Sequence, residues 1–464
     1  MTHTPNPAHT ARESKEPVIV VGAGIAGMTA AFRLQQAGHP VRVLEREDRA
    51  GGRMRTVRRR GYHMDLAAIL LIENYTQMRD LVRDLDIEDT TLRTNNLVGI
   101  RRDGRVHRLR ANRPTDLKRS GLLPWSSVPA MVRLQADLRK YAGRLRWNSD
   151  MGEAATLDTE TAAAYAERRL DTEFRDYVVD PMSAMFFNSP PDLSVVNFLF
   201  SMPAVNSEWF NFHDRVDTLT TTLAARLDVE TRAEVTQVEE TSDGVRVHWR
   251  REGEPEHTEE AAAAIVALPG PVAAGLCPGL APSTLDYLAN VPYVPDIHVY
   301  FGVDRVPSEP ATCVLFPQRE HADLGVITFN HNFAPGRAPQ GHALLTSYYR
   351  YPWAMAHWDD DDDTVEALTH EIHRQAWPEM ARHIEAHQDM AYVQRWKNAV
   401  ILRKPGDYAR LRAFNQGLDP RSRIQLAGDY LGFSATNSSL VTGERAARRV
   451  REVVTGGAVA AGRV

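Results

Sequence analysis

Short runs of consecutive aliphatic residues recur along the chain and predict buried strands. Val18–Val21 and Ala264–Leu268 are two such runs without a charged side chain. Runs of this kind are typical of parallel strands, which are covered on both faces. Between the first run and Val41–Leu44, apolar residues recur at helical spacing, and Gly38 marks the end of that helix. The pattern predicts an α/β fold that begins with a strand, a helix and a second strand.

A different pattern fills residues 291–417. Three strand-like runs, Ile297–Val303, Gly325–Asn330 and Ala343–Tyr349, precede a stretch with helical periodicity at 365–377. An acidic run lies just before this stretch, and acids at a helix N-terminus oppose its dipole favourably. We prefer this interpretation to metal or partner binding by the aspartates. The pattern predicts an α+β domain and no metal site.

Residues 101–147 combine apolar and basic positions. Counting along this segment gives thirteen Lys and Arg, three Asp and no Glu, a local net charge of about +10 in a chain of −5. One interpretation is a helical face with a solvated basic side, or a channel that attracts an acidic substrate. The others are contact with an anionic membrane surface or with an acidic partner. We predict a helical subdomain over residues 101–211 and leave these alternatives open.

The composition is that of a globular protein, with 464 residues of which 43% are hydrophobic. Its mild acidity argues against binding of nucleic acid. The two cysteines, Cys277 and Cys313, exclude a Cys-x-x-Cys motif and a cysteine zinc site. Residues 1–16 are polar and predict a disordered tail rather than a secretory signal. Prolines interrupt the uncharged stretch at 261–285, so we expect no transmembrane helix.

Gly22, Gly24 and Gly27 form a G-x-G-x-x-G turn between the first strand and its helix. In this context the first glycine allows a tight turn, and the second lets the backbone approach a pyrophosphate. The third lets the helix pack against the strand, and the helix N-terminus presents N–H groups to the phosphates. We predict a nucleotide-binding turn; the alternative is a tight turn that binds no ligand.

The second strand ends at Glu45, whose carboxylate can accept hydrogen bonds from ribose hydroxyls and disfavours a 2′-phosphate. From there the chain runs through Arg46 to Gly51, Gly52 and Arg53. This G-G-R segment resembles that of the flavin amine oxidase superfamily, which includes protoporphyrinogen oxidases and carotenoid desaturases. The resemblance implies that the two glycines carry the chain over FAD, that Arg53 lies along its phosphates and flavin, and that Arg46 belongs to the same site. The alternative is a basic surface loop.

The other end of the chain carries the same resemblance. Gly428 and Asp429 look like the family's closing strand, in which the acidic residue contacts the ribityl or pyrophosphate part of FAD. Residues 439–447 are similar to the final helix, whose N-terminal amides approach the flavin, with Thr442 in place of the usual serine. By the same resemblance the backbone of Val235 contacts the adenine. The segment lacks the cysteine to which some relatives attach FAD, so the expected FAD is non-covalent.

The resemblance covers nearly the whole chain and implies three parts. A Rossmann-type FAD-binding domain is discontinuous and comprises residues 17–100, 212–290 and 418–455. The helical subdomain lies at 101–211, and an α+β substrate-binding domain lies at 291–417.

Three residues are candidates for catalysis. Amine-oxidising relatives carry a lysine that holds a water near flavin N5, and the similar stretch of this chain has His298. Histidine can act as a base near pH 7, and a buried structural histidine is the alternative. Trp396 and Lys397 lie in a segment that resembles the R-W-x-x-A motif of protoporphyrinogen oxidase-like proteins. The resemblance places Trp396 beside the flavin, whereas Lys397 has a surface lysine as its alternative.

The resemblance implies an FAD-dependent oxidoreductase. We expect it to abstract hydride from a C–H bond, next to nitrogen or in a C–C bond, of a largely hydrophobic small molecule in specialised metabolism. Electrons would pass to O2 or to another acceptor. An isomerase or mutase without net redox, and a non-catalytic flavoprotein scaffold, remain as alternatives. We expect a cytoplasmic location, with or without peripheral contact to a membrane, and the oligomeric state stays open.

Overall fold

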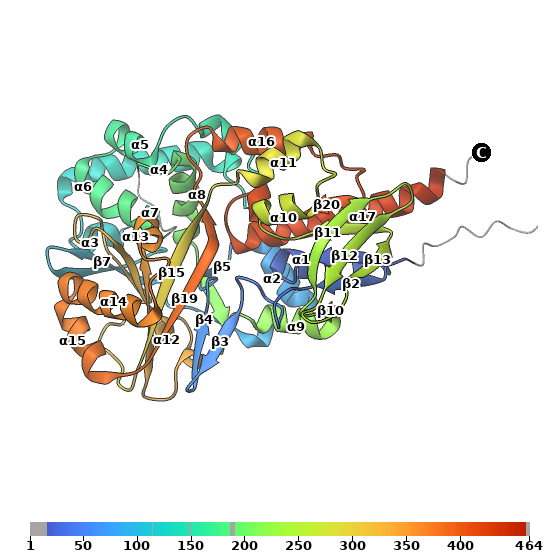
Figure 1. Cartoon of the computed structure of the whole chain (residues 1–464). Coiled ribbons are helices and arrows are strands. Elements are labelled where there is room, and N and C mark those ends of the chain that lie inside the picture. Colours follow the sequence, from blue (N-terminus) through green and yellow to red (C-terminus); the bar gives the residue numbers. More distant parts are fainter. Residues whose placement is uncertain (1–15, 114, 148–149, 186–190, 461–464) are drawn as a thin grey trace, which may run out of the picture.

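A five-stranded parallel sheet forms one half of the molecule (Figure 1). The computed structural model describes residues 16–113, 115–147, 150–185 and 191–460. The expected tail at 1–16 therefore lies outside the described residues except for Glu16. Every neighbouring pair of strands in this sheet is parallel, as the uncharged runs predict. In sheet order the strands are β10 (Asp228–Glu230), β2 (Val41–Leu44), β1 (Val18–Val21), β14 (Ala263–Val266) and β20 (Ile424–Leu426).

Two long helices, α1 (Ile25–Gln36) and α17 (Thr436–Ala460), pack against each other beside this sheet. A Cβ atom on Gly443 would lie 2.1 Å from the carbonyl oxygen of Ala26, so the two backbones touch at that point. The first and last segments of the chain are thereby joined. The other elements of this half are α2 (Thr76–Asp84), α9 (Thr218–Arg226), α10 (Gly270–Leu276), α11 (Pro282–Ala289), α16 (Asp407–Gly417), β11 (Glu234–Glu240), β12 (Val245–Arg250) and β13 (His257–Ala261).

A seven-stranded mixed sheet forms the core of the other half. The predicted strands at 297–303, 325–330 and 343–349 are confirmed as parts of it. One face of it packs against α14 (Asp362–Ala376) and α15 (Pro378–His387). In sheet order the strands are β19 (Gln388–Ile401), β15 (Tyr293–Val303), β18 (Ala343–Tyr349), β17 (Leu324–Phe329), β16 (Cys313–Leu315), β7 (Leu97–Arg102) and β8 (Arg105–Arg110).

The first residues of the segment predicted as a helical subdomain form a strand instead. β7 and β8 belong to the seven-stranded sheet rather than to the FAD-binding or the helical part. The physical reason is that β8 is an edge strand, and its sequence mixes three arginines with the apolar Val106 and Leu109. Such a mixture has the same composition as a basic amphipathic helix. The helical subdomain itself begins at α3 (Asp116–Arg119).

The helical subdomain covers the other face of the seven-stranded sheet (Figure 1). In Figure 1, α14 and α15 lie on the opposite side of that sheet from α7 and α8. No helix among the described residues is long and apolar enough to span a membrane. The further helices of the subdomain are α4 (Val128–Tyr141), α5 (Ala162–Arg169), α6 (Thr172–Phe174), α7 (Asp180–Ala184) and α8 (Val195–Val205), with a π-helical turn at Arg175–Val179.

Two small antiparallel sheets connect the halves. The hairpin of β3 (Thr56–Arg59) and β4 (Tyr62–Asp65) follows the first glycine-rich region directly. Asp65 at the end of this hairpin accepts a hydrogen bond from Thr56 at 2.6 Å and pairs with Arg337 at 2.6 Å. The second sheet consists of β5 (Leu71–Ile72), β9 (Trp209–Phe212) and β6 (Thr91–Arg93).

Candidate active site

The glycine turn after β1 has the geometry that its motif predicts. Gly22 has a φ of +99°, in the left-handed region that favours glycine. A Cβ atom on Gly27 would lie 2.0 Å from the carbonyl oxygen of Gly22, so α1 can approach the turn only with glycine there. At Gly24 a Cβ atom would meet nothing within 4 Å. The turn therefore opens at Gly24, the position where the motif places a pyrophosphate.

Glu45 braces this turn from the end of β2. Its carboxylate accepts the backbone N–H of Ala23 at 2.7 Å and that of Glu47 at 2.9 Å. Burial raises the pKa of the Glu45 carboxyl, and the two N–H donors oppose that rise. Arg46 is exposed and pairs with Glu47 at 3.1 Å. Its side chain lies on the surface, so the structure does not bring Arg46 together with the glycine turn as the sequence suggested.

The second glycine-rich segment packs directly on the first. The N–H of Gly51 donates to the carbonyl of Ala23 at 2.8 Å, and Gly51 forms a bridge with Gly24. Gly51 and Gly52 have φ values of +122° and +53°. A Cβ atom on Gly52 would lie 3.3 Å from the Cα of Gly24. Both segments thus meet at the open side of the turn, as the resemblance implied.

Arg53 joins the two ends of the chain. Its guanidinium donates to a carboxylate oxygen of Asp429 at 2.7 Å and to the carbonyl of Ala399 at 2.8 Å. The hydroxyl of Tyr293 donates to the other oxygen of Asp429 at 2.6 Å. Burial of Asp429 opposes its ionisation, but the charge of Arg53 and the two hydrogen bonds lower its pKa. The cluster therefore carries an ion pair beside the glycine turns, with Arg53 still 30% exposed.

The last helix departs from the expected position. α17 begins at Thr436, so Thr442 lies in its second turn rather than at its N-terminus. The hydroxyl of Thr442 accepts the N–H of Gly428 at 2.9 Å and donates to the carbonyl of Ser439 at 2.7 Å. Thr442 is buried and holds the helix to the turn after β20. The N–H groups that face outward along the helix axis belong to the turn that starts at Thr436.

Val235 lies in β11, close to the end of β2. Two residues before it, Ala233 donates its N–H to the carbonyl of Glu45 at 2.8 Å. The pairing of β11 with β12 is irregular between Val235 and Gln237. This irregularity lies beside the predicted adenine contact, and the contact itself stays a prediction.

A buried polar face lies on β15. Asp296, His298 and Tyr300 alternate with Ile297 and Val299, which pack toward α14 and α15. The polar residues therefore point to the opposite face of the sheet, where Tyr300 packs with Tyr62, Met64 and Leu66 at the β3–β4 hairpin. Nε2 of His298 contacts a carboxylate oxygen of Asp296, and both side chains are at most 1% exposed.

Burial disfavours the charged form of each group of this pair. It raises the pKa of Asp296 well above its usual value and lowers the pKa of His298 to about 3. A histidine with that pKa is uncharged near pH 7, and the predicted role of His298 as a base stays a prediction. His298 offers a neutral ring with one donor and one acceptor. The ring of Tyr348 lies 4.3 Å away, at 62° to it.

Trp396 and Lys397 behave differently although they are neighbours. Trp396 lies opposite Asp296 in the β15–β19 pairing, and its Nε1 donates to the carbonyl of Leu66 at 3.0 Å. Lys397 is exposed, since successive residues of a strand point to opposite faces. The structure groups Trp396 with the polar face and leaves Lys397 outside it.

Sequence reasoning missed Tyr293 and Asp296. Asp296 stands two residues before His298 on one strand, and that period of two is the signal that could have found Asp296. The role of Tyr293 depends on Asp429, which is 136 residues away in the sequence. No local pattern contains that contact.

The chain is similar in sequence and in structure to known flavin oxidases. L-amino acid oxidase Lm29 from Lachesis muta is 30% identical over 174 residues, which is 36% of this chain and 30% of that protein. The match thus spans about a third of this relative's length. A solved putrescine oxidase bound to putrescine has a TM-score of 0.72 at 17% identity, covering 94% of this chain and 99% of that chain.

A solved cyclohexylamine oxidase from Brevibacterium oxydans has a TM-score of 0.70 at 18% identity, covering 97% of this chain and 100% of that one. These structural likenesses show the fold. They confirm the predicted mixed α/β architecture with a parallel sheet. The family model of flavin containing amine oxidoreductases matches residues 25–451. The resemblance inferred from the motifs is thereby confirmed, and the chain belongs to the family of flavin containing amine oxidoreductases.

Proposed function

We propose that this protein is an FAD-dependent oxidase or dehydrogenase that removes hydride from a carbon bonded to nitrogen. The substrate class is a partly apolar amine or amino acid. The observation that carries the proposal is the buried polar face of Asp296 and His298. This face lies on β15, the strand that also carries Tyr293. Tyr293 is hydrogen-bonded to Asp429, which pairs with Arg53 next to the glycine turns. Family membership and a relative named as an L-amino acid oxidase support C–N rather than C–C oxidation.

The residues at the glycine turns fit FAD. Gly24 is open, and the N-terminus of α1 has no side-chain cap, so its backbone N–H groups can bind phosphate oxygens. Glu45 would bind the adenosine ribose, and Val235 would contact the adenine. Arg53 and Asp429 would lie along the pyrophosphate and ribityl chain. Bound FAD supplies the two-electron acceptor for hydride.

Binding of FAD is proposed to be non-covalent. Cys277 and Cys313 are the chain's two cysteines, and both are buried. Cys277 packs in the hydrophobic core around the parallel sheet, and Cys313 lies on β16, three strands from His298. Burial raises the pKa of each thiol to about 12, which disfavours the thiolate needed for attachment.

The polar face would select the neutral form of an amine. Because burial disfavours the charged forms of Asp296 and His298, the face is a poor counter-ion for an ammonium group. It does provide hydrogen bonds for an amine whose lone pair is available. That lone pair assists departure of hydride, since the C–H bond breaks as a C=N bond forms. The reaction also needs a face from which water is excluded, and burial of this pair meets that condition.

Two experiments test the proposal. FAD released on denaturation, in a ratio near one per chain, would support the cofactor; a colourless protein without FAD would contradict it. Product analysis with and without O2 separates oxidation from the isomerase or mutase alternative. Oxidation gives a carbonyl product and peroxide in air. A product that is an isomer of the substrate, with no peroxide formed in air, would favour the isomerase or mutase. A protein that binds FAD but forms no product would favour a non-catalytic scaffold.

Contact of the basic segment 101–147 with a membrane or an acidic partner stays a prediction. The surface at α3 and α4 carries two exposed apolar side chains, Trp125 at 75% and Val132 at 60%. The ammonium of Lys118 lies 3.1 Å from the centroid of the Trp125 ring. An aromatic residue among cations suits the headgroup region of an anionic bilayer.

A further inference from the structure

The strand β8 forms a free edge of the seven-stranded sheet. It is the last strand in the sheet order, next to β7. A two-residue turn joins the two strands at Asp103 and Gly104, whose φ values are +50° and +74°. In such a hairpin the flanking residues, Arg102 and Arg105, form a hydrogen-bonded pair, and hydrogen-bonded pairs then recur at every second residue. The residues between them turn their backbone groups away from β7.

The hydrogen bonds around β8 agree with this register. Ala111, directly after the strand, donates its N–H to the residue before β7 at 2.9 Å. Arg110 donates in the opposite direction, to the carboxylate of Asp116 at 3.3 Å. Since backbone groups alternate in direction along a strand, those of Val106 and Arg108 also point outward. Among the residues that the structure describes, no hydrogen bond reaches the outward N–H or C=O of either residue.

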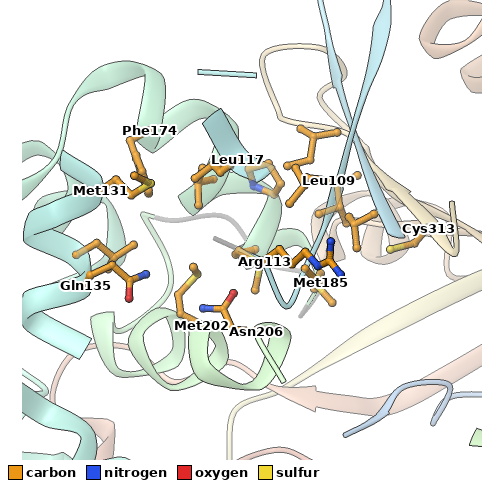
Figure 2. A pocket seen from close by; sticks show the side chains of 18 of the residues that line it. Leu109, Arg113, Leu117, Met131, Gln135, Phe174, Met185, Met202, Asn206 and Cys313 are labelled. Atoms are coloured by element: carbon orange, nitrogen blue, oxygen red, sulfur yellow. The ribbon is translucent and has the colours of Figure 1, made fainter. Parts of the chain in front are cut away.

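Both faces of this edge carry arginine. Figure 2 shows Leu109 pointing into an apolar cavity under the helical subdomain. Because residues two apart share a face of a strand, Arg105 and His107 lie on the same face as Leu109. Arg108 lies on the other face and binds Glu309 through two hydrogen bonds of 2.9 and 2.8 Å. The charge of Arg108 is therefore already compensated within the protein.

An open groove of about 460 Å³ lies on the face of Arg105, between the hairpin and the loop after α3. The hairpin lines it with Arg102, Asp103, Arg105 and His107, and the loop lines it with Leu123 and Pro124. Arg102 is compensated by Asp103 at 3.4 Å and by Glu173 at 2.5 Å. Arg105 is exposed and has no carboxylate partner among the described residues. The groove therefore keeps one uncompensated cation next to the free edge.

The charges around the edge decide which kind of strand it can accept. Residues 101–147 carry a net charge of about +10 by direct count. A second copy paired through β8 would bring arginines opposite arginines, and like charges directly across strands are destabilising. Arginines on an edge thus repel copies of the same strand and attract an acidic one. Trp125, 75% exposed beside Pro124, offers such a partner an apolar contact.

We propose that β8 is a docking site for an extended acidic segment of a partner protein, which adds to the sheet as a further strand. The backbone of this segment pairs with the outward N–H and C=O groups of Val106 and Arg108. These main-chain bonds give affinity, and its alternate side chains give specificity. Its acidic side chains on the groove side lie next to Arg105. A strand is favoured over a lipid surface because it offers donors and acceptors at the spacing of the edge. The inference does not depend on the flavin reaction.

The test measures binding of a fluorescein-labelled peptide, in which glutamate alternates with valine, to the full chain as purified. Fluorescence anisotropy should show binding to the wild type, and a peptide with lysine in place of glutamate should not bind. Val106→Pro removes an outward N–H that β7 does not use, and we expect affinity to fall at least about tenfold. Arg105→Glu should lower affinity about tenfold as well, through like-charge repulsion. Arg139→Glu, at an exposed position of α4, is the matched charge control and should stay within about twofold.

A second peptide separates strand addition from charge attraction and needs no protein variant. The same acidic sequence with every backbone nitrogen methylated keeps its charge but has no N–H donors, so it should not bind the wild type. Equal binding of the methylated and unmethylated peptides, or equal affinity in folded Val106→Pro and wild type, overturns the inference. Failure of the acidic peptide to bind, with phosphatidylserine vesicles bound equally by wild type and Val106→Pro, overturns it too and assigns the surface to a membrane.

Discussion

The glycine turns and the His298 face are built by different parts of the chain. At the turns the backbone bounds the open space, since Gly22, Gly24 and Gly52 stand where side chains would clash or occupy that space. At the sheet face strand pairing brings polar side chains into one row. Substitutions at the turns should therefore act through steric exclusion of FAD. Substitutions on the face should change turnover and leave FAD in place.

The largest effect is expected at Gly27. In Gly27→Ala the new Cβ would lie 2.0 Å from the carbonyl oxygen of Gly22, which forces α1 away from β1. We expect at least a tenfold loss of bound FAD per chain, measured by absorbance after gel filtration. Gly275→Ala on α10 is the control, since a Cβ there meets nothing within 4 Å. Full FAD occupancy in Gly27→Ala would refute the role assigned to the turn.

The second prediction distinguishes the His298 face from the glycine turns. His298→Asn and Asp296→Asn keep a polar group on β15 but change its hydrogen bonds. We expect kcat to fall about 10²-fold or more with FAD content unchanged. Because burial lowers the pKa of His298 to about 3, the wild-type rate should show no step from this group between pH 5 and 9. A rate step that disappears in His298→Asn would show that the histidine titrates after all.

The third effect concerns the ion pair between Arg53 and Asp429. Arg53→Met leaves the buried Asp429 carboxylate without its cation, at an expected cost of about 2 kcal/mol because Arg53 is partly exposed. The lowered pKa of Asp429 stabilises the fold fully above its unfolded value of 3.8, and this contribution is lost as pH falls below it. Urea unfolding at pH 7 and pH 3 measures the loss of stability in Arg53→Met and its dependence on pH. An equal loss of stability in Arg53→Met at both pH values would contradict the pairing.

The smallest effect is expected at the basic surface. Trp125→Ser removes the most exposed aromatic side chain near α4. Co-sedimentation with phosphatidylserine vesicles at low salt should fall about threefold, and high salt should reduce binding of the wild type. Met355→Ser, at an exposed position before α14, is the control. If the wild-type protein stays in the supernatant at low salt, membrane binding is excluded and contact with an acidic partner remains as the alternative.

Much of the nucleotide end could be predicted from sequence because its geometry is local. The glycine positions follow from one strand–turn–helix unit, and Glu45 follows from the strand after it. The direction of the Arg46 side chain could not be predicted, because a sequence does not tell which way a loop side chain points. The start of α17, six residues before Thr442, could not be predicted either, and the contacts of Arg46 and Thr442 with FAD stay predictions.

The substrate side could be predicted only in part, because its contacts are not local. The strand at 297–303 was expected, but pairing with β18 and β19 decides which of its residues face the site. The strand at 105–110 was assigned to the helical part because its edge position mixes three arginines with apolar residues.

We propose that bound FAD accepts hydride from an amine at the His298 face. Mixing the holoenzyme with decylamine under anaerobic conditions tests it most directly, with absorbance followed at the flavin bands. We predict bleaching within seconds in the wild type, and bleaching slowed about 10²-fold in His298→Asn at equal FAD content. Absence of bleaching by any of a panel of amines and amino acids, with FAD bound, would contradict the claim.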